Sequence, residues 1–258
     1  MRILFVGDVI GRPGRKILQQ QLPDIIVHEQ IDLTIVNCEN SAAGFGVTPE
    51  IAEQLLDLGA DVLTSGNHIW DKKQILPYFA EQPRLLRPAN YPEAPGGGLY
   101  IGCTAQAVKY AVMNLQGRTY MPSTDCPFRA ADQLLQQIDD DVTVRFIDFH
   151  AEVTSEKVAF GWHLDGRVSA VVGTHTHVPT ADYRVLPGGT AYMTDCGMTG
   201  PLDSVIGMER EGSVRRFLTG MPNRFEPAAG PIRMNAVVID VDPKTGHATA
   251  IRRLTADT

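Results

Sequence analysis

The feature that most limits the fold of this chain is a regular alternation of short apolar runs with segments of helical period. The runs at 2–7, 32–37 and 61–65 have the length of buried strands, and the segments between them repeat apolar residues every three to four positions. This order is typical of α/β folds, in which strands and helices alternate. It does not fit an all-α or an all-β protein.

The helices of the first half are predicted from their apolar faces and end signals. One begins near Gly11, and Pro23 is expected to kink or divide it. A second begins at 48–49, where Thr precedes Pro, and stops at Gly59, as an N-cap and a C′ glycine predict. A third is expected over 72–81.

The second half has more β character and ends in a hairpin. Helices are expected over 128–138 and 156–164, and the turn of the hairpin over 242–246. Strands are expected over 99–103, 108–115, 142–149, 168–173, 191–194, 235–242 and 247–254. This count fits a two-sheet sandwich flanked by helices, formed by a single domain over residues 1–258.

Charge, hydropathy and cysteine content exclude several classes of protein. The net charge is −7, and like charges do not cluster, which argues against a partner such as DNA or a membrane surface. No apolar stretch approaches the roughly 18 residues of a membrane span. The four cysteines contain no C-x-x-C pair, so neither a disulfide framework nor a zinc knuckle is expected, and the cytoplasm is the expected location. A chain of this length folds without a structural metal, so any metal would serve chemistry.

Metal-competent side chains follow strand after strand along the chain. They are Asp8, Glu39, Asn40, Asn67, His68, His150, His175 and His177. Because ligand sites of α/β sheets lie outside the carboxyl ends of strands, we expect these side chains to converge.

Most members of this set also have an ordinary structural interpretation. Asp8, Asn40 and Asn67 could be turn or cap residues, and His150 could be a surface histidine paired with a neighbouring carboxylate. The His-x-His pair at 175–177 is harder to explain in this way, because residues two apart in an extended segment face the same side.

The combination of side chains predicts metal-assisted hydrolysis. Carboxylates together with imidazoles suit Mn, Fe or Zn rather than Ca or Mg. Two such ions bridged by a carboxylate can hold a phosphoryl oxygen and generate a hydroxide nucleophile near neutral pH. A histidine outside the metal ligands would then protonate the leaving oxygen.

Five segments resemble, in order, the five blocks of the calcineurin-like metallophosphoesterases: 7–8, 37–40, 66–68, His150 and 173–177. The Gly-Asn-His and Gly-x-His-x-His blocks are the most specific. Two departures stand out. Ile10 occupies the position of a usual second histidine ligand, and Glu39-Asn40 replaces the usual Gly-Asp. With the surrounding sequence at 7–15, 37–46, 66–71 and 194–200, these departures are similar to the YmdB-like branch of bacterial phosphoesterases.

The resemblance implies a four-layer α/β/β/α sandwich of two mixed sheets flanked by helices. It also implies two metal ions per chain, iron or manganese in preference to zinc, and hydrolysis of 2′,3′- or 3′,5′-cyclic nucleotides by a hydroxide that bridges the ions. His68 would be the general acid and Glu39 the bridging ligand. The remaining ligands would be Asp8, Asn40 and His177 for the first ion, and Asn67, His150 and His175 for the second.

Several alternatives stay open. The same metals could serve a phosphomonoesterase, or the chain could be a regulatory protein that senses a nucleotide or RNA end with little turnover. A homo-oligomer is also compatible with the sequence.

Four further residues and one segment have open interpretations. Arg12 and Arg15 could bind an anion, although a solvated helix face is the simpler interpretation. Phe45 could stack on a base or lie in a plain turn. Cys38 is expected to be buried rather than a ligand, and 194–200 could border the pocket without an assigned role.

Overall fold

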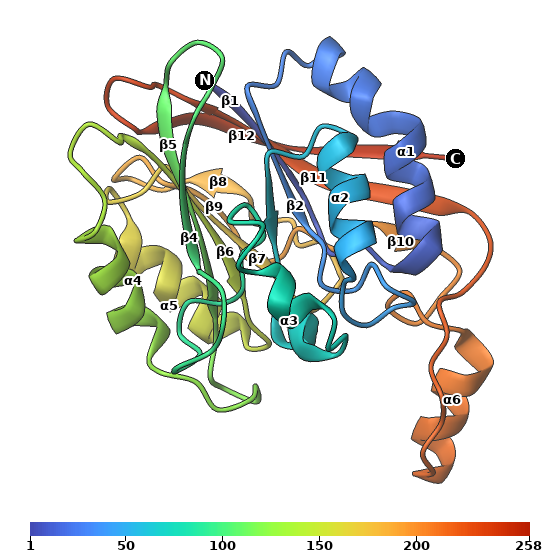
Figure 1. Ribbon diagram of the computed structural model, residues 1–258. Helices are drawn as coiled ribbons and strands as arrows, with labels where there is room; N and C mark the ends of the chain where they lie inside the picture. Colours follow the sequence, from blue (N-terminus) through green and yellow to red (C-terminus); the bar gives the residue numbers. More distant parts are fainter.

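The computed structural model describes all residues from 1 to 258 and contains two mixed sheets that lie face to face (Figure 1). In the first six-stranded sheet, β1, β2 and β3 are parallel, and β11 runs antiparallel to β1. The short β10 and the long β12 both pair with β11. The strands are β1 (Arg2–Val6), β2 (Leu33–Asn37), β3 (Val62–Thr64), β10 (Gly200–Pro201), β11 (Ile232–Val241) and β12 (Ala248–Asp257).

The second six-stranded sheet has the order β4-β5-β6-β7-β9-β8. Its four central strands are parallel, and the two edge strands β4 and β8 are antiparallel to their neighbours. The strands are β4 (Leu99–Cys103), β5 (Lys109–Gln116), β6 (Val144–His150), β7 (Ala170–Thr174), β8 (Arg184–Val185) and β9 (Ala191–Met193).

Helices cover the outer face of each sheet. Helices α1 (Gly11–His28) and α2 (Pro49–Asp57) pack on the first sheet, and α4 (Pro127–Leu135) and α5 (Thr154–Leu164) pack on the second (Figure 1). The expected four-layer α/β/β/α sandwich is therefore confirmed.

The side chains of β1 show how the sequence produces these layers. Ile3 and Phe5 face the second sheet, where the ring centroid of Phe5 lies 5.1 Å from that of Phe146. Leu4 and Val6 face α1 and α2 instead. Successive residues of a strand point to opposite faces, so a strand covered on both sides must be apolar throughout.

Two sequence predictions about helices need correction. Pro23 was expected to kink or divide its helix, and it does not divide α1, which is continuous over Gly11–His28. Pro23 is exposed, as is Gln19, whose carbonyl loses its helical partner and can bind water instead. The helix expected over 72–81 is shorter than predicted, because only α3 (Ile75–Tyr78) is helical in this range, and a 3-10 turn, η1 (Asn67–Trp70), precedes it. Proline fits a helix without loss of a hydrogen bond only in the first turn, and Pro77 lies in the first turn of α3 because this helix begins at Ile75.

Three elements were not expected from the sequence: the two-residue strands β8 and β10, and helix α6 (Arg210–Thr219). Helix α6 projects away from the body of the molecule, at the lower right of Figure 1. Only Ser213 of this helix is buried. The helix therefore has no apolar stripe of the kind from which a core helix is predicted. No helix of the chain combines the length and apolar character needed to cross a membrane.

Candidate metal centre

The carboxyl ends of strands from both sheets bring all eight predicted site residues into one contact network. Asp8 and Glu39 lie two residues beyond β1 and β2, and Asn67 opens η1 after β3. From the second sheet, His150 is the last residue of β6 and His175 directly follows β7. The network also includes Asn40, His68 and His177.

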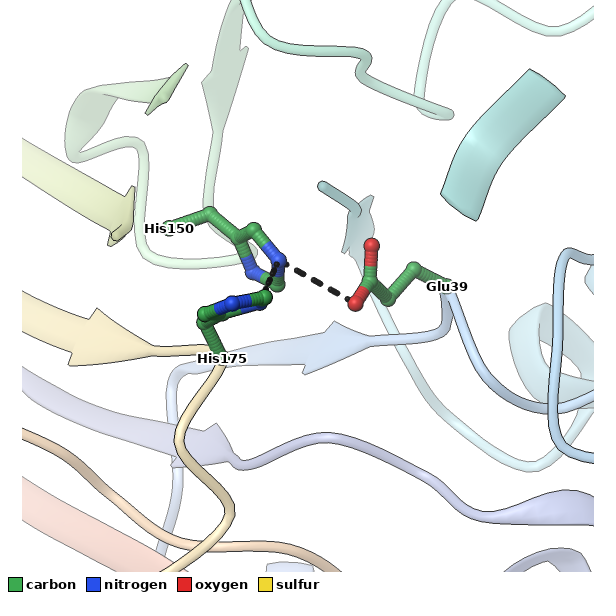
Figure 2. Close-up of side chains that lie close together, drawn as sticks. All are labelled: Glu39, His150 and His175. Atoms are coloured by element: carbon green, nitrogen blue, oxygen red, sulfur yellow. Dashed lines mark hydrogen bonds and ion pairs between the residues drawn. The ribbon is translucent and has the colours of Figure 1, made fainter. Parts of the chain in front are cut away.

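His150 lies at the centre of one half of this network (Figure 2). Its Nε2 atom is 3.0 Å from Asn67 Oδ1, 3.0 Å from His175 Nδ1 and 3.2 Å from Glu39 Oε1. One ring nitrogen carries at most one hydrogen and cannot satisfy three such neighbours. Ligand atoms that share an ion at about 2.1 Å lie roughly 3.0 to 3.4 Å from one another, so this spacing fits a bound transition metal.

Asp8, Asn40 and His177 form the other half. Asn40 Nδ2 lies 3.2 Å from His177 Nε2 and donates to Glu39 Oε1 at 3.1 Å. Asp8 Oδ1 is fully buried, has no hydrogen-bond partner, and lies 3.8 Å from His177 Nε2. A buried carboxylate oxygen without a partner is costly unless a cation faces it. Asp8 Oδ1 and His177 Nε2 therefore fit a metal here as well, and Glu39 connects the two halves. Asn40 turns its Nδ2 toward the site, and this nitrogen has no lone pair for a metal, so Asn40 would bind an ion through Oδ1 after rotation of its side-chain amide.

Hydrogen bonds behind the histidines orient their lone pairs toward the centre. His150 Nδ1 lies 2.9 Å from Thr174 Oγ1, whose hydroxyl donates to Asp148 Oδ1 at 2.7 Å. The hydroxyl must therefore accept from Nδ1, which leaves Nε2 free to bind a metal. His177 Nδ1 likewise donates to the Ile206 carbonyl at 2.9 Å.

Asp148 and Thr174 are functional residues that sequence reasoning missed. The alternative that made His150 a paired surface histidine is wrong, because His150 and Asp148 are both fully buried. Burial raises the pKa of Asp148 to about 7. The sequence signal was the carboxylate of Asp148 between the apolar residues Ile147 and Phe149, two positions before His150 and facing the same side.

The charges of the centre favour a cation. Burial raises the pKa of Glu39, but the nearby His150 outweighs it and lowers the value to about 2. Burial lowers the pKa of His150, but Glu39 and Asp8 raise it to about 9. Burial and His150 lower the pKa of His175 to about 3. A metal would replace the proton on His150, so its binding should release protons.

The loop that carries His175 and His177 is held in a strained conformation. Their φ angles are +99° and +65°, a region that costs about 1 to 3 kcal/mol for a residue other than glycine. Asp195 braces this loop by accepting from the Thr176 amide at 3.1 Å and the Thr176 hydroxyl at 2.8 Å. Buried Lys157 donates to Asp195 Oδ2 at 2.6 Å and to the Thr174 carbonyl at 2.7 Å. The segment 194–200 thus has a structural role that its sequence did not reveal.

Gly66 is required by the packing of the His150 ring. A Cβ atom at this position would lie 2.2 Å from both Nε2 and Cδ2 of His150, so the ring would have to move. Glycine is therefore required at position 66 because a side chain there would displace the His150 ring, and not because the backbone adopts a conformation that only glycine allows.

Gly66→Ala is expected to weaken metal binding about 10- to 100-fold, the usual effect of disturbing the support of a ligand. Metal titration of the apoprotein, with the melting temperature as a check on folding, measures this effect. Gly97→Ala is the matched control, because a Cβ there would meet only the Leu99 carbonyl oxygen, at 3.7 Å. Unchanged metal affinity in Gly66→Ala would contradict the placement of His150 in the site.

A cavity of about 480 Å³ opens beside the metal centre, within the usual size range of small-ligand sites. Glu39, Asn40, His175 and His177 line one side of it, and residues of α6 line another. Phe45 borders the cavity beside His68, with 5.0 Å between the ring centroids.

His68 is placed to exchange a proton with a bound molecule. Its Nδ1 atom lies 2.9 Å from Asp71 Oδ2, so Nδ1 carries a hydrogen and Nε2 remains available. Its backbone amide donates to Glu39 Oε2 at 3.1 Å, which fixes the residue beside the metal centre. The side chain is 31% exposed, so solvent and substrate can reach it.

Other predicted candidates lie outside the cavity. Arg12 and Arg15 border a separate hollow between α1 and α2, where Arg12 is exposed and Arg15 half-buried. Cys38 is fully buried in the core beneath these helices, and burial raises the pKa of its thiol.

Comparisons with known proteins identify relatives of the chain in sequence and in fold. The chain is 51% identical to the 2′,3′-cyclic-nucleotide 2′-phosphodiesterase of Bacillus subtilis (strain 168), over 98% of this chain and 96% of that protein. A crystal structure of a hypothetical protein from Thermus thermophilus superposes with a TM-score of 0.93 at 41% identity, covering 100% of this chain and 99% of that one. A structure described as a novel phosphatase from Mycoplasma pneumoniae superposes with a TM-score of 0.94 at 36% identity, covering 100% of this chain and 93% of the other. The YmdB-like protein family matches residues 4–254, and the chain therefore belongs to that family.

Proposed function

We propose that this protein is a metal-dependent phosphodiesterase that hydrolyses cyclic nucleotides, with 2′,3′-cyclic nucleotides as the preferred class. The observation that carries the proposal is the meeting of Glu39, His150 and His175, whose ligand atoms lie within 4.8 Å of one another beside the cavity. The relative at 51% identity supports the choice of substrate, since it bears the name of a 2′,3′-cyclic-nucleotide 2′-phosphodiesterase.

Two ions of iron or manganese would fit the two halves of the centre, with zinc as a further candidate. Asp8, Asn40 and His177 would hold one, Asn67, His150 and His175 the other, and Glu39 both. Bound there, such ions supply Lewis acidity toward a phosphoryl oxygen and an activated nucleophile near neutral pH. The amide of Asn40 replaces the imidazole that other metallophosphoesterases use, so we expect the first site to bind its ion more weakly.

The protein residues then have three tasks. Thr174 and Ile206 fix the tautomers of His150 and His177, so that their Nε2 lone pairs face the site. Protonated His68 donates its Nε2 hydrogen to the leaving ribose oxygen, and Asp71 orients and stabilises the ring. The apolar side of the cavity excludes water from around the ester.

The test is a product screen of protein with measured metal content. Iron- or manganese-loaded protein is expected to hold two ions per chain and to open 2′,3′-cyclic nucleotides faster than 3′,5′-cyclic ones. Fewer than two ions after loading, without cleavage of any diester, would contradict the proposal. Release of phosphate from monoesters alone would indicate a phosphomonoesterase, and tight nucleotide binding without turnover would indicate a sensor.

A further inference from the structure

The projection formed by residues 205–228, which contains α6, is fixed to the metal centre at its base. The Glu209 amide donates to the Glu226 carbonyl at 3.0 Å, and the Ala228 amide donates to the Gly207 carbonyl at 2.9 Å. Ile206, at the start of the projection, accepts the Nδ1 hydrogen of His177. Although α6 extends away from the body in Figure 1, its base therefore has a set position relative to the metal ligands.

Arg216 and Phe225 form a stacked pair on this projection. The guanidinium carbon of Arg216 lies 5.1 Å from the centroid of the Phe225 ring, and both residues line the cavity of the metal centre. Arg216 forms no ion pair, whereas Arg210 and Arg224 each lie within 4.0 Å of a nearby glutamate. The exposed Arg216 therefore keeps one face and its N–H groups available to a ligand.

Such a pair suits a nucleobase. Guanidinium planes and aromatic rings are surfaces on which bases stack, and the guanidinium edge can donate to the oxygen and nitrogen acceptors of a base. The metal centre accounts for the phosphate at one side of the cavity. Phe45 lies on that side, beside His68. A base that extends from the phosphate toward α6 would meet Arg216 and Phe225, which add a guanidinium and a second aromatic ring.

We propose that Arg216 and Phe225 bind the base of the cyclic nucleotide while its phosphate lies at the metal centre. This inference rests on the proposed function and adds the residues that distinguish a nucleotide from a simple phosphodiester. Arg216 and Phe225 are binding residues and take no part in the chemical step.

The experiment compares a 2′,3′-cyclic nucleotide with glycerol 1,2-cyclic phosphate, which has a five-membered cyclic ester but no base. In Arg216→Ala and in Phe225→Leu, the ratio of kcat/KM for the nucleotide to that for the base-free ester should fall about 10- to 100-fold, mainly through KM. Arg215→Ala is the matched control, because Arg215 is the neighbouring exposed arginine of α6 and does not line the cavity. Its ratio should equal that of the unmodified protein.

Each outcome decides the inference. Values of kcat/KM that stay unchanged for both esters in both variants would overturn it while leaving the proposed function intact. An equal loss on both esters, which leaves the ratio unchanged, would show that Arg216 acts on the phosphate and would also overturn it. If the unmodified, metal-loaded protein cleaves neither ester, the proposed function fails first and the base-binding role fails with it. Melting temperatures of the variants show whether α6 has kept its fold.

Discussion

Removal of metal with a chelator is expected to abolish hydrolysis and to weaken nucleotide binding about 100-fold or more, with the fold retained. Without metal, Asp8 and Glu39 repel the phosphate, and Glu152 adds a further carboxylate to the lining of the cavity. The proton on His150 reduces the charge of −2 on Asp8 and Glu39 to about −1, and two divalent ions that displace this proton would bring the same residues to about +2. The chain itself has a net charge of −7, so its overall field gives no attraction for the substrate.

This prediction separates a metal that binds substrate from one that only activates the nucleophile. Calorimetric titration with a nucleotide measures the affinity of the apoprotein and the reloaded protein, and circular dichroism measures the fold of each. The three apolar clusters of the core do not depend on metal, so the dichroism spectrum should be unchanged. Arg216 contributes one positive charge to the cavity, and its contribution should remain in the apoprotein. Equal nucleotide affinity with and without metal would contradict the electrostatic argument.

Most of the fold could be predicted from the sequence because buried strands and helix faces have distinct apolar periods. Leu99–Cys103 was predicted to the residue, and the first two helices were placed within a few residues of their observed ends. The failures have local causes. The two-residue strands are too short to show a period, and α6 turns too little surface toward the core to show a stripe.

The meeting of the candidate ligands could be predicted because metal-competent side chains follow strands that the fold brings together. The residues that hold these side chains in place could not be predicted, because each of them acts through a contact between segments that are distant in the sequence. Asp148 reaches Thr64, Thr174 and Asn37 through the packing of two sheets, and Lys157 reaches Asp195 across 38 positions. The ion pair of Lys157 with Asp195 and the contact of Arg216 with Phe225 join residues whose spacing in the sequence follows no recognisable pattern. The sequence is therefore informative about which polar side chains meet at the candidate site, and less so about the contacts that hold them in place.

His68→Asn is expected to lower kcat for a 2′,3′-cyclic nucleotide about 10²- to 10⁴-fold, the usual range for loss of a general acid. The reason is the leaving group. A ribose alkoxide is a strong base and needs a proton as its bond to phosphorus breaks, whereas p-nitrophenolate is stable without one. The loss should therefore be much smaller for bis-p-nitrophenyl phosphate. The Asn amide can replace the Nδ1 hydrogen bond to Asp71 but cannot donate an acidic proton, and the backbone bond from residue 68 to Glu39 is kept.

The comparison of the two leaving groups distinguishes loss of the general acid from a structural effect of the substitution. If His68→Asn disturbed the metal centre through its backbone bond to Glu39, both esters would lose activity equally and the metal content would fall. Asp71→Asn should give a smaller loss with the same preference between esters, because it removes the partner of Nδ1 and leaves the imidazole in place. His28→Asn is the matched control, since His28 is an exposed residue of α1 and bonds only to the Asp24 carbonyl. Full activity of His68→Asn on the cyclic nucleotide would contradict this role and show that another group protonates the leaving oxygen.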